Sequence, residues 1–226
     1  MFSAMIWDMD GTLVDSEPLW ARGTFAMSEA MGKRLTPELQ AQTVGASFSY
    51  TARLCAEHAG VELFDEAYWR RFAFENMRKM FSEELTLRPG VATMLQRFKA
   101  SGVPMAIATN TEREVADAAI AFLGAELFQA TVCGDEVPQG KPAPDIYHRA
   151  AELLGVAPSQ CLVFEDSQAG MRAALAAKAT VVGLPEREED LVQGAASMRA
   201  LVGGIDFDFD QAGDLAFWCD ALQMGD

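Results

Sequence analysis

The feature that most constrains the fold is an alternation of short apolar runs and helical segments in the second half of the chain. The apolar runs lie within GVPMAIATN, FQATVCGDE, QCLVFEDS and ATVVGLP. Segments of helical composition lie between them, from Glu112 to Leu123, from Ile146 to Leu154 and from Ala169 to Ala177. Strands that alternate with helices pair in parallel through crossover connections. The pattern therefore predicts an α/β fold with a doubly wound parallel sheet.

The segment from Glu17 to about Leu87 has a different pattern, with helical stretches, polar breaks and no good strand run. It follows an apolar run at the start of the chain, Phe2 to Trp7, which we interpret as the first strand. The simplest interpretation is a helical insertion between that strand and the rest of the sheet. We therefore predict a discontinuous core of residues 1–16 and 86–226 and an inserted α-helical domain of residues 17–85.

The charge of the chain excludes several classes of partner. The formal net charge is −15, whereas nucleic acids and anionic membranes are bound by basic surfaces. No apolar stretch approaches the roughly 20 residues of a membrane span, and we see no signal-peptide pattern at the N-terminus. The four cysteines are far apart, which favours reduced, buried thiols. We expect a cytoplasmic protein, and a monomer is the default.

Polar side chains stand where the predicted strands end. Each of them alone has an ordinary explanation as a turn residue, a helix cap or a solvated charge. In a parallel sheet, however, the carboxyl ends of the strands meet at one edge, where ligands bind. We therefore expect these side chains to converge in one crevice. They are Asp8 and Asp10, Thr109 and Asn110, Glu165 and Asp166, and Lys141 in the loop after the FQATVCGDE run.

The stretch DMDGT, which holds Asp8 and Asp10, raises the question of what offsets two carboxylates at the edge of a core. Unpaired buried charge costs several kcal/mol. A divalent cation with oxygen ligands would offset it, and Glu165 and Asp166 would supply further oxygens. A carboxylate can also act as a covalent nucleophile and form an aspartyl phosphate. The pattern is therefore typical of phosphoryl chemistry.

Two further residues fit the same chemistry. The Lys141 ammonium and the Thr109 hydroxyl would hold phosphoryl oxygens and stabilise the charge that develops in the transition state. Asp10 lies two residues beyond Asp8 and, on an extended backbone, on the same side. There it would protonate a leaving oxygen and later accept a proton from water.

Four motifs, in this order, carry a family resemblance: DMDGTLVDSE, IATN, GKPAPD and VFEDSQAG. Together with the helical insertion, they make the chain similar to the haloacid dehalogenase-like superfamily. It resembles the capped branch that includes sugar-phosphate phosphatases and β-phosphoglucomutase. The resemblance implies a Rossmann-like core, a helical cap over residues 17–85 and Mg²⁺ as the cofactor.

The resemblance also implies a role for each motif residue. Asp8 is the expected nucleophile and a metal ligand, and Asp10 is the expected acid/base, which binds the metal through its backbone carbonyl. Asp166 is expected to bind Mg²⁺, with Glu165 in support directly or through water. Thr109, Lys141 and the backbone of Asn110 are expected to bind the phosphoryl group. We expect Gly170 to serve helix packing.

The motif residues also discriminate between activities. A dehalogenase is disfavoured because a halide leaving group needs no acid, whereas Asp10 is present. A mutase grips a second phosphate with a cap-loop arginine, and Phe48 stands about where that arginine would be. We predict a phosphatase that acts on a small phosphorylated metabolite, a sugar phosphate or related phosphomonoester, with a phosphomutase as the alternative.

The cap loop, one acidic run and the two histidines are the remaining candidates for functional residues. The cap loop of Gly45, Ala46, Ser47 and Phe48 is the best candidate to contact the leaving group. The DFDFD run, from Asp206 to Asp210, is interpreted as an edge strand rather than a second metal site. His58 and His148 lie on helical patterns without a partner motif and receive no catalytic role.

Overall fold

A computed structural model describes residues 2–202 and 215–223 of the chain. By the contacts between their residues, two compact units are distinguished: residues 1–15 with 86–226, the core unit, and residues 16–85, the helical unit. The predicted division places only residue 16 differently. That the helical unit acts as a cap stays a prediction.

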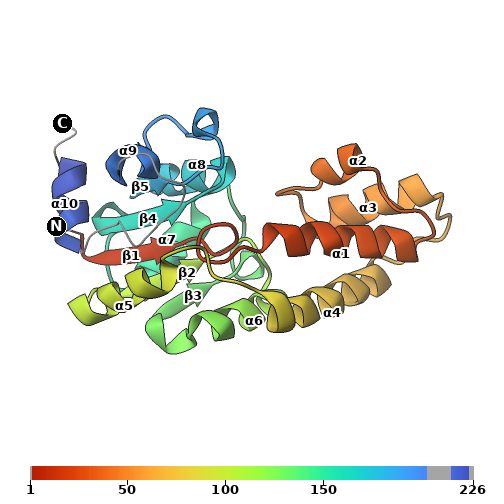
Figure 1. The fold of residues 1–226 in the computed structure, drawn as a ribbon, viewed down its shortest axis with the longest axis horizontal. Coiled ribbons are helices and arrows are strands. Elements are labelled where there is room, and N and C mark those ends of the chain that lie inside the picture. The colour runs from red at the N-terminus through yellow and green to blue at the C-terminus, as the bar shows by residue number, and fades with distance from the viewer. Residues whose placement is uncertain (1, 203–214, 224–226) are drawn as a thin grey trace. The chain divides into compact units, whose positions relative to one another are not determined.

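The core unit is built on a six-stranded sheet in which every neighbouring pair is parallel, in the order β3-β2-β1-β4-β5-β6 (Figure 1). The strands are β1 (Ala4–Trp7), β2 (Met105–Ala108), β3 (Ala130–Val132), β4 (Cys161–Glu165), β5 (Thr180–Gly183) and β6 (Ala196–Ser197). The predicted doubly wound parallel sheet is confirmed. β6 was not predicted, because a run of two residues is too short to show a strand pattern.

Helices connect the strands. The α-helices of the core unit are α5 (Val91–Ser101), α6 (Arg113–Leu123), α7 (Asp145–Leu153), α8 (Gln168–Ala176), α9 (Met198–Val202) and α10 (Leu215–Gln223). The three helices predicted between the strands, α6, α7 and α8, begin and end within one residue of the predicted positions. Short 3₁₀ helices are η1 (Ala125–Leu127), η2 (Gly134–Glu136), η3 (Pro158–Gln160) and η4 (Glu188–Asp190). The order of the strands places β1 between β2 and β4, so the chain reverses its winding direction there.

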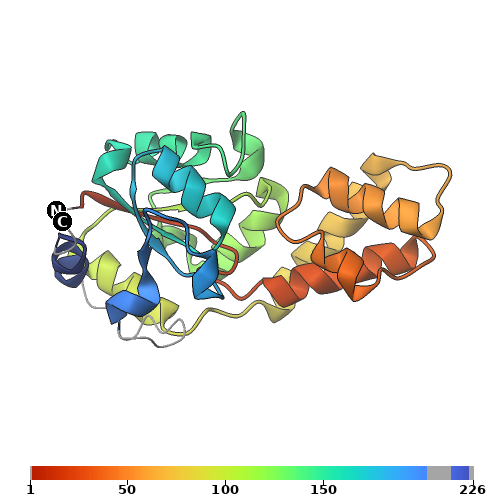
Figure 2. The ribbon, with the colours of Figure 1, turned by 90° about the horizontal axis from the view of Figure 1, so that it is seen from above.

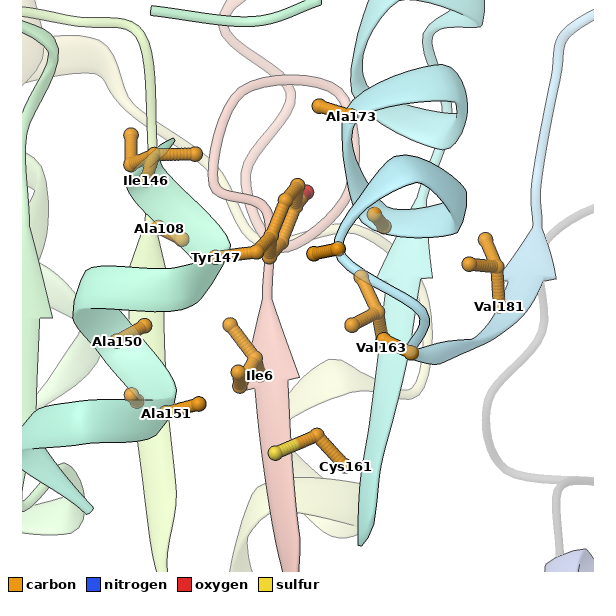
Figure 3. Close-up of a cluster of buried hydrophobic side chains, with 14 of the residues drawn as sticks. Ile6, Ala108, Ile146, Tyr147, Ala150, Ala151, Cys161, Val163, Ala173 and Val181 are labelled. Carbon is orange, nitrogen blue, oxygen red and sulfur yellow. The ribbon is translucent and has the colours of Figure 1, made fainter. Parts of the chain in front are cut away.

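Alternate residues of the strands face opposite layers of helices, which is why the strands read as continuous apolar runs. On one face, Ile6 and Val163 pack in a cluster with Ala150 of α7 and Ala173 of α8 (Figure 3). The alanines let both helices approach the sheet closely. Figure 2 shows α7 and α8 on one side of the sheet and α5 on the other.

The opposite face is filled by aromatic rings. Trp7 of β1 stacks on Phe164 of β4, with ring centroids 4.2 Å apart and planes inclined by 10°. Phe98 of α5 lies 5.7 Å from Trp7, and Trp218 of α10 meets Phe164 edge to face at 5.0 Å. Both Trp7 and Phe164 immediately precede acidic residues of the predicted site. The large rings therefore anchor the two strands that present those residues.

The two ends of the insertion are joined inside the core unit. Val14 forms an antiparallel bridge with Leu87, and the Asp15 N–H donates to the Thr86 carbonyl at 2.9 Å. The Arg88 N–H donates to the Leu13 carbonyl at 3.0 Å. The chain thus leaves the core unit and returns to it at adjacent, hydrogen-bonded positions.

The helical unit holds four helices: α1 (Glu17–Ala30), α2 (Pro37–Ala41), α3 (Phe48–Ala59) and α4 (Glu66–Glu84). One buried cluster includes Met27 of α1, Leu35 before α2 and Cys55 of α3. α1 and α4 pack closely at Gly23, where an added Cβ would lie 2.6 Å from the Met77 sulfur. The unit therefore has a hydrophobic core of its own.

The DFDFD run and the membrane-spanning potential of the helices are the two remaining sequence-based predictions about the fold. The DFDFD run lies outside the described residues. Among residues 2–202 and 215–223, none of the helices combines the length and the apolar character that crossing a bilayer requires.

The environment of the cysteines leads to a first prediction. All four cysteines are buried free thiols, and burial raises the pKa of Cys55 and Cys161 to about 11 and that of Cys133 to about 12. Because the thiolate is the reactive form, these three should react with a disulfide reagent at pH 8 only as the protein unfolds. A time course of thiol labelling, with the denatured chain as the control, measures this. Rapid labelling of any of these three thiols in the native protein would contradict the buried environments.

Candidate active site

The site lies at the carboxyl ends of β1, β2 and β4, within the core unit. The Asp8 N–H donates to the Phe164 carbonyl at 3.0 Å, which extends the pairing of β1 with β4 by one residue. The chain then turns at Gly11, whose φ of +82° is in the left-handed region. A Cβ at Gly11 would lie 2.1 Å from Asp166 Oδ2. Glycine at this position therefore permits both the turn and the approach of Asp166.

A buried lysine joins two of the predicted acids. Lys141 Nζ lies 2.5 Å from Asp8 Oδ1 and 2.5 Å from Glu165 Oε1. The side chains of Lys141 and Asp8 are 3% and 8% exposed, and that of Glu165 is fully buried. Burial lowers the pKa of Lys141, but the charges of Asp8 and Glu165 raise it by more, so the net shift is upward. Lys141 therefore stays an ammonium ion in the site.

The acids outnumber this one cation. Asp8, Glu165 and Asp166 each place a carboxylate oxygen within 4.8 Å of the others. Burial raises the pKa of Asp8 to about 8; Lys141 opposes the shift, and Glu165 and Asp10 add to it. Burial and the charge of Asp8 also raise the pKa of Asp166 well above its usual value. The site thus holds more negative charge than Lys141 can balance.

One oxygen of Asp8 stands out. Oδ1 contacts Lys141, whereas the buried Oδ2 has no hydrogen-bond partner among the described residues. A buried carboxylate oxygen without a partner carries a desolvation cost that a ligand would relieve. Hard divalent cations prefer carboxylate and carbonyl oxygens. The cluster of Asp8, Glu165 and Asp166 therefore offers oxygen ligands of the kind that a hard divalent cation such as Mg²⁺ prefers.

Asp10 is held by two threonines that follow β2. The hydroxyls of Thr109 and Thr111 both donate to Asp10 Oδ2, at 3.1 Å and 2.8 Å. The Thr109 hydroxyl also accepts from the Thr111 N–H at 3.1 Å. In this structure Thr109 thus contacts the predicted acid/base, and its predicted contact with a phosphoryl group stays a prediction. Thr111 was not identified from sequence, although its place directly after the IATN motif is a usable signal.

Asn110 connects the end of β2 to the lysine loop. Its side-chain oxygen accepts from the Lys141 N–H at 2.8 Å, and its side-chain nitrogen donates to the Lys141 carbonyl at 3.2 Å. A Cβ at Gly140 would lie 2.7 Å from the Asn110 side-chain oxygen, and one at Gly134 would lie 2.3 Å from its carbonyl oxygen. The amide therefore fixes the backbone that presents Lys141.

The Glu165 carboxylate is surrounded by donors. Tyr147 donates its hydroxyl to Oε1 at 2.7 Å, and the Ser167 N–H and hydroxyl donate to Oε2 at 3.1 Å and 3.0 Å. A Cβ at Gly170 would lie 1.6 Å from Oε1. The sequence predicted a packing role for Gly170, and the structure adds a specific reason for it, because any side chain there would displace Glu165. Tyr147 and Ser167 were not singled out from sequence.

The neighbouring Asp166 is held by the loop after β1. The Thr12 hydroxyl donates to Asp166 Oδ1 at 3.3 Å. Thr12 is fully buried, so this contact fixes the loop that carries Asp10 and Gly11 against the end of β4.

The predicted cap-loop residues lie in the helical unit. Gly45, Ala46 and Ser47 are exposed, and the Ser47 side chain caps α3 by accepting from the Tyr50 N–H at 3.3 Å. Phe48 begins α3 and packs against Phe74 of α4, with ring centroids 5.7 Å apart. Their expected contact with a leaving group stays a prediction.

Comparison with known proteins adds independent observations. A family model described as haloacid dehalogenase-like hydrolase matches residues 2–178. A phosphorylated carbohydrates phosphatase from Thermotoga maritima is 35% identical over 183 residues, 77% of this chain and 81% of that protein. A fructose-1-phosphate phosphatase from Escherichia coli is 35% identical over 182 residues, 78% of this chain and 93% of that protein.

A solved structure is similar over nearly the whole chain. It is a mutant of the protein CbbY from Rhodobacter sphaeroides in complex with xylulose 1,5-bisphosphate. Its TM-score is 0.79 at 26% sequence identity, and the match covers 96% of this chain and 99% of that one.

The raised pKa of Asp8 leads to a prediction about metal binding. Because burial raises the pKa of Asp8 to about 8, a proton competes with Mg²⁺ for its carboxylate as the pH falls below that value. Binding at pH 7 should therefore release a proton, and the affinity should rise by up to about tenfold per pH unit until pH 8. Calorimetry in two buffers of different protonation enthalpy measures the protons released. Binding that is independent of pH between 6 and 8 would contradict the prediction.

Proposed function

The chain belongs to the haloacid dehalogenase-like hydrolase family, as its motifs predicted, and from this premise we propose that it is a magnesium-dependent phosphatase. Its proposed substrate is a small phosphorylated metabolite, a sugar phosphate or a related phosphomonoester. The observation that carries the proposal is the buried Asp8 Oδ2, which has no partner among the described residues, next to the ammonium of Lys141. The two curated relatives named above, both phosphatases of phosphorylated sugars, support the substrate class.

In the first step, one carboxylate oxygen of Asp8 attacks the phosphorus of the substrate. A bond forms between that oxygen and phosphorus, and the bond from phosphorus to the leaving oxygen breaks, which gives an aspartyl phosphate. Lys141 stabilises the charge on the phosphoryl oxygens. The Asp10 carboxyl, oriented by the hydroxyls of Thr109 and Thr111, gives its proton to the leaving oxygen.

In the second step, water attacks the phosphorus of the aspartyl phosphate. Asp10, now a carboxylate, accepts a proton from that water, the bond between phosphorus and Asp8 breaks, and inorganic phosphate leaves. The cycle thus returns Asp8 as a carboxylate and Asp10 as an acid. The same residue serves both steps because the leaving oxygen and the water occupy the same position.

The metal would be held by Asp8, Asp166 and the backbone carbonyl of Asp10, with Glu165 in support. When bound, Mg²⁺ would balance the excess negative charge of the site and polarise the phosphoryl group. The cluster of oxygens within 4.8 Å supports this assignment. Cytoplasmic location and a monomeric state stay predictions.

A phosphomutase is the second candidate. Such an enzyme must hold a second phosphate, and Phe48 stands where its arginine was expected. The Arg70 guanidinium, however, lies 6.0 Å from the centroid of the Phe48 ring and 4.3 Å from that of Phe74. A cation is therefore close to this position, so the activity assay must measure both products.

A panel of phosphorylated sugars and related metabolites, incubated with the protein and Mg²⁺, tests the proposal. We expect release of inorganic phosphate and its loss on chelation of the metal. Asp8→Asn should abolish release while the circular dichroism spectrum stays unchanged, because the amide oxygen is a poor nucleophile. An isomerised product without phosphate release would establish the mutase, and wild-type rates in the variant would remove Asp8 as the nucleophile.

Asp10→Asn separates the two steps. Because Asp10 handles the proton in both, the variant should form and hydrolyse the aspartyl phosphate at least about 100-fold more slowly, the usual contribution of a general acid or base. Rapid-quench measurement of the phosphorylated protein follows each step. Thr24→Ala, a change in the helical unit, serves as the control. A variant of Asp10 that still turns over at the wild-type rate would assign the proton to another group.

A further inference from the structure

A buried tyrosine contacts the carboxylate that holds Lys141. Tyr147 lies in the first turn of α7, and its side chain is fully buried. Figure 3 shows it projecting from α7 between the end of β1 and α8, within a cluster made mostly of alanine, valine and isoleucine. A buried hydroxyl in such a cluster requires a partner. That partner is Glu165 Oε1, at 2.7 Å.

The contacts of Glu165 fix its orientation. Oε1 accepts from Lys141 and Tyr147, and Oε2 accepts twice from Ser167. A carboxylate offers about four acceptor positions, so these four hydrogen bonds occupy its capacity. Rotation of the carboxylate toward a cation would break at least one of them. Gly170 removes the side chain that would otherwise fill the same space.

We propose that Tyr147 is a positioning residue, whose hydroxyl holds Glu165 as the partner of Lys141 and not as a direct ligand of the divalent cation. The Lys141 ammonium is thereby directed at Asp8 and at the phosphoryl group that Asp8 receives. This inference rests on the proposed phosphatase function. It adds Tyr147, which belongs to none of the four motifs, to the residues of the site.

The contribution of the Tyr147 hydroxyl can be measured separately from that of its ring. The Lys141 nitrogen lies 5.3 Å from the centroid of the ring, a contact that phenylalanine would preserve. Phenylalanine would also preserve the packing against the sheet. Tyr147→Phe therefore removes one hydrogen bond to Glu165 and little else.

The test compares Tyr147→Phe with the wild type in four measurements: kcat and KM for a substrate from the panel, orthovanadate binding, and Mg²⁺ binding by calorimetry. We expect kcat to fall and vanadate binding to weaken by about tenfold each, the order expected for a lost hydrogen bond to a charged group. KM and the Mg²⁺ affinity should stay within about twofold, because the Tyr147 hydroxyl is buried and acts only through Glu165, which the proposal keeps off the cation.

Two further variants make the test specific. Tyr68→Phe removes the hydroxyl of a half-exposed tyrosine in the helical unit and should leave all four values unchanged. Ser167→Ala removes the hydroxyl donor to the other oxygen of Glu165, together with the cap that this hydroxyl forms on the Gly170 N–H of α8, and should reproduce the pattern of Tyr147→Phe. If Tyr147→Phe does not fold, Ser167→Ala carries the test alone.

The outcomes are distinguishable. Unchanged kcat and vanadate binding in Tyr147→Phe would overturn the inference, and so would a tenfold loss of Mg²⁺ affinity, which would place Glu165 on the cation. If the wild type hydrolyses nothing in the panel, the proposed function fails instead. Vanadate and Mg²⁺ binding need no turnover, so they test Tyr147 in that case too.

Discussion

The ion pairs of Lys141 with Asp8 and Glu165 are the interaction on which the site depends. Removing two carboxylates and an ammonium from water is costly, and the attraction between them repays this only when the remaining hydrogen-bonding positions are also filled. Those of Glu165 are filled by Tyr147 and Ser167, whereas one oxygen of Asp8 is left without a partner among the described residues. The ion pair of Lys141 with Glu165 therefore has its hydrogen-bonding positions filled, whereas Asp8 keeps one oxygen that a ligand can contact.

The backbone around this pair is fixed by short, specific contacts. Asn110 binds both the N–H and the carbonyl of Lys141, and the aromatic stack of Trp7 on Phe164 anchors the two strands that end in Asp8 and Glu165. Three elements distant in sequence are thus joined where the chemistry is proposed. Rigid placement of this kind is what electrostatic stabilisation of a transition state requires, because the charges need not reorganise during the reaction.

Much of this arrangement could be predicted from the sequence, because buried parallel strands read as apolar runs and the residues that end them must meet at one edge of the sheet. The apolar runs alone therefore place Asp8, Glu165 and Asp166 together. The contacts that were missed depend on tertiary packing. Tyr147 reads as one more apolar residue of α7, and nothing in its neighbours indicates that its hydroxyl reaches Glu165. The sequence indicates only that Gly170 lies in a helix. The reason that it must be glycine is that the Glu165 carboxylate, at the end of β4, occupies the space of a side chain there.

The hydrogen bonds that join residues 13–15 to 86–88 have a consequence for how such a protein can diversify. Residues 13–15 and 86–88 are hydrogen-bonded to each other within the core unit. The entropic cost of closing the chain at this point therefore depends only weakly on the length of the segment between them. Insertions, deletions or the exchange of the entire helical module would leave the reactive edge of the sheet unaltered. Sequence changes in residues 16–85 could thus accumulate while the residues at the edge of the sheet stay the same.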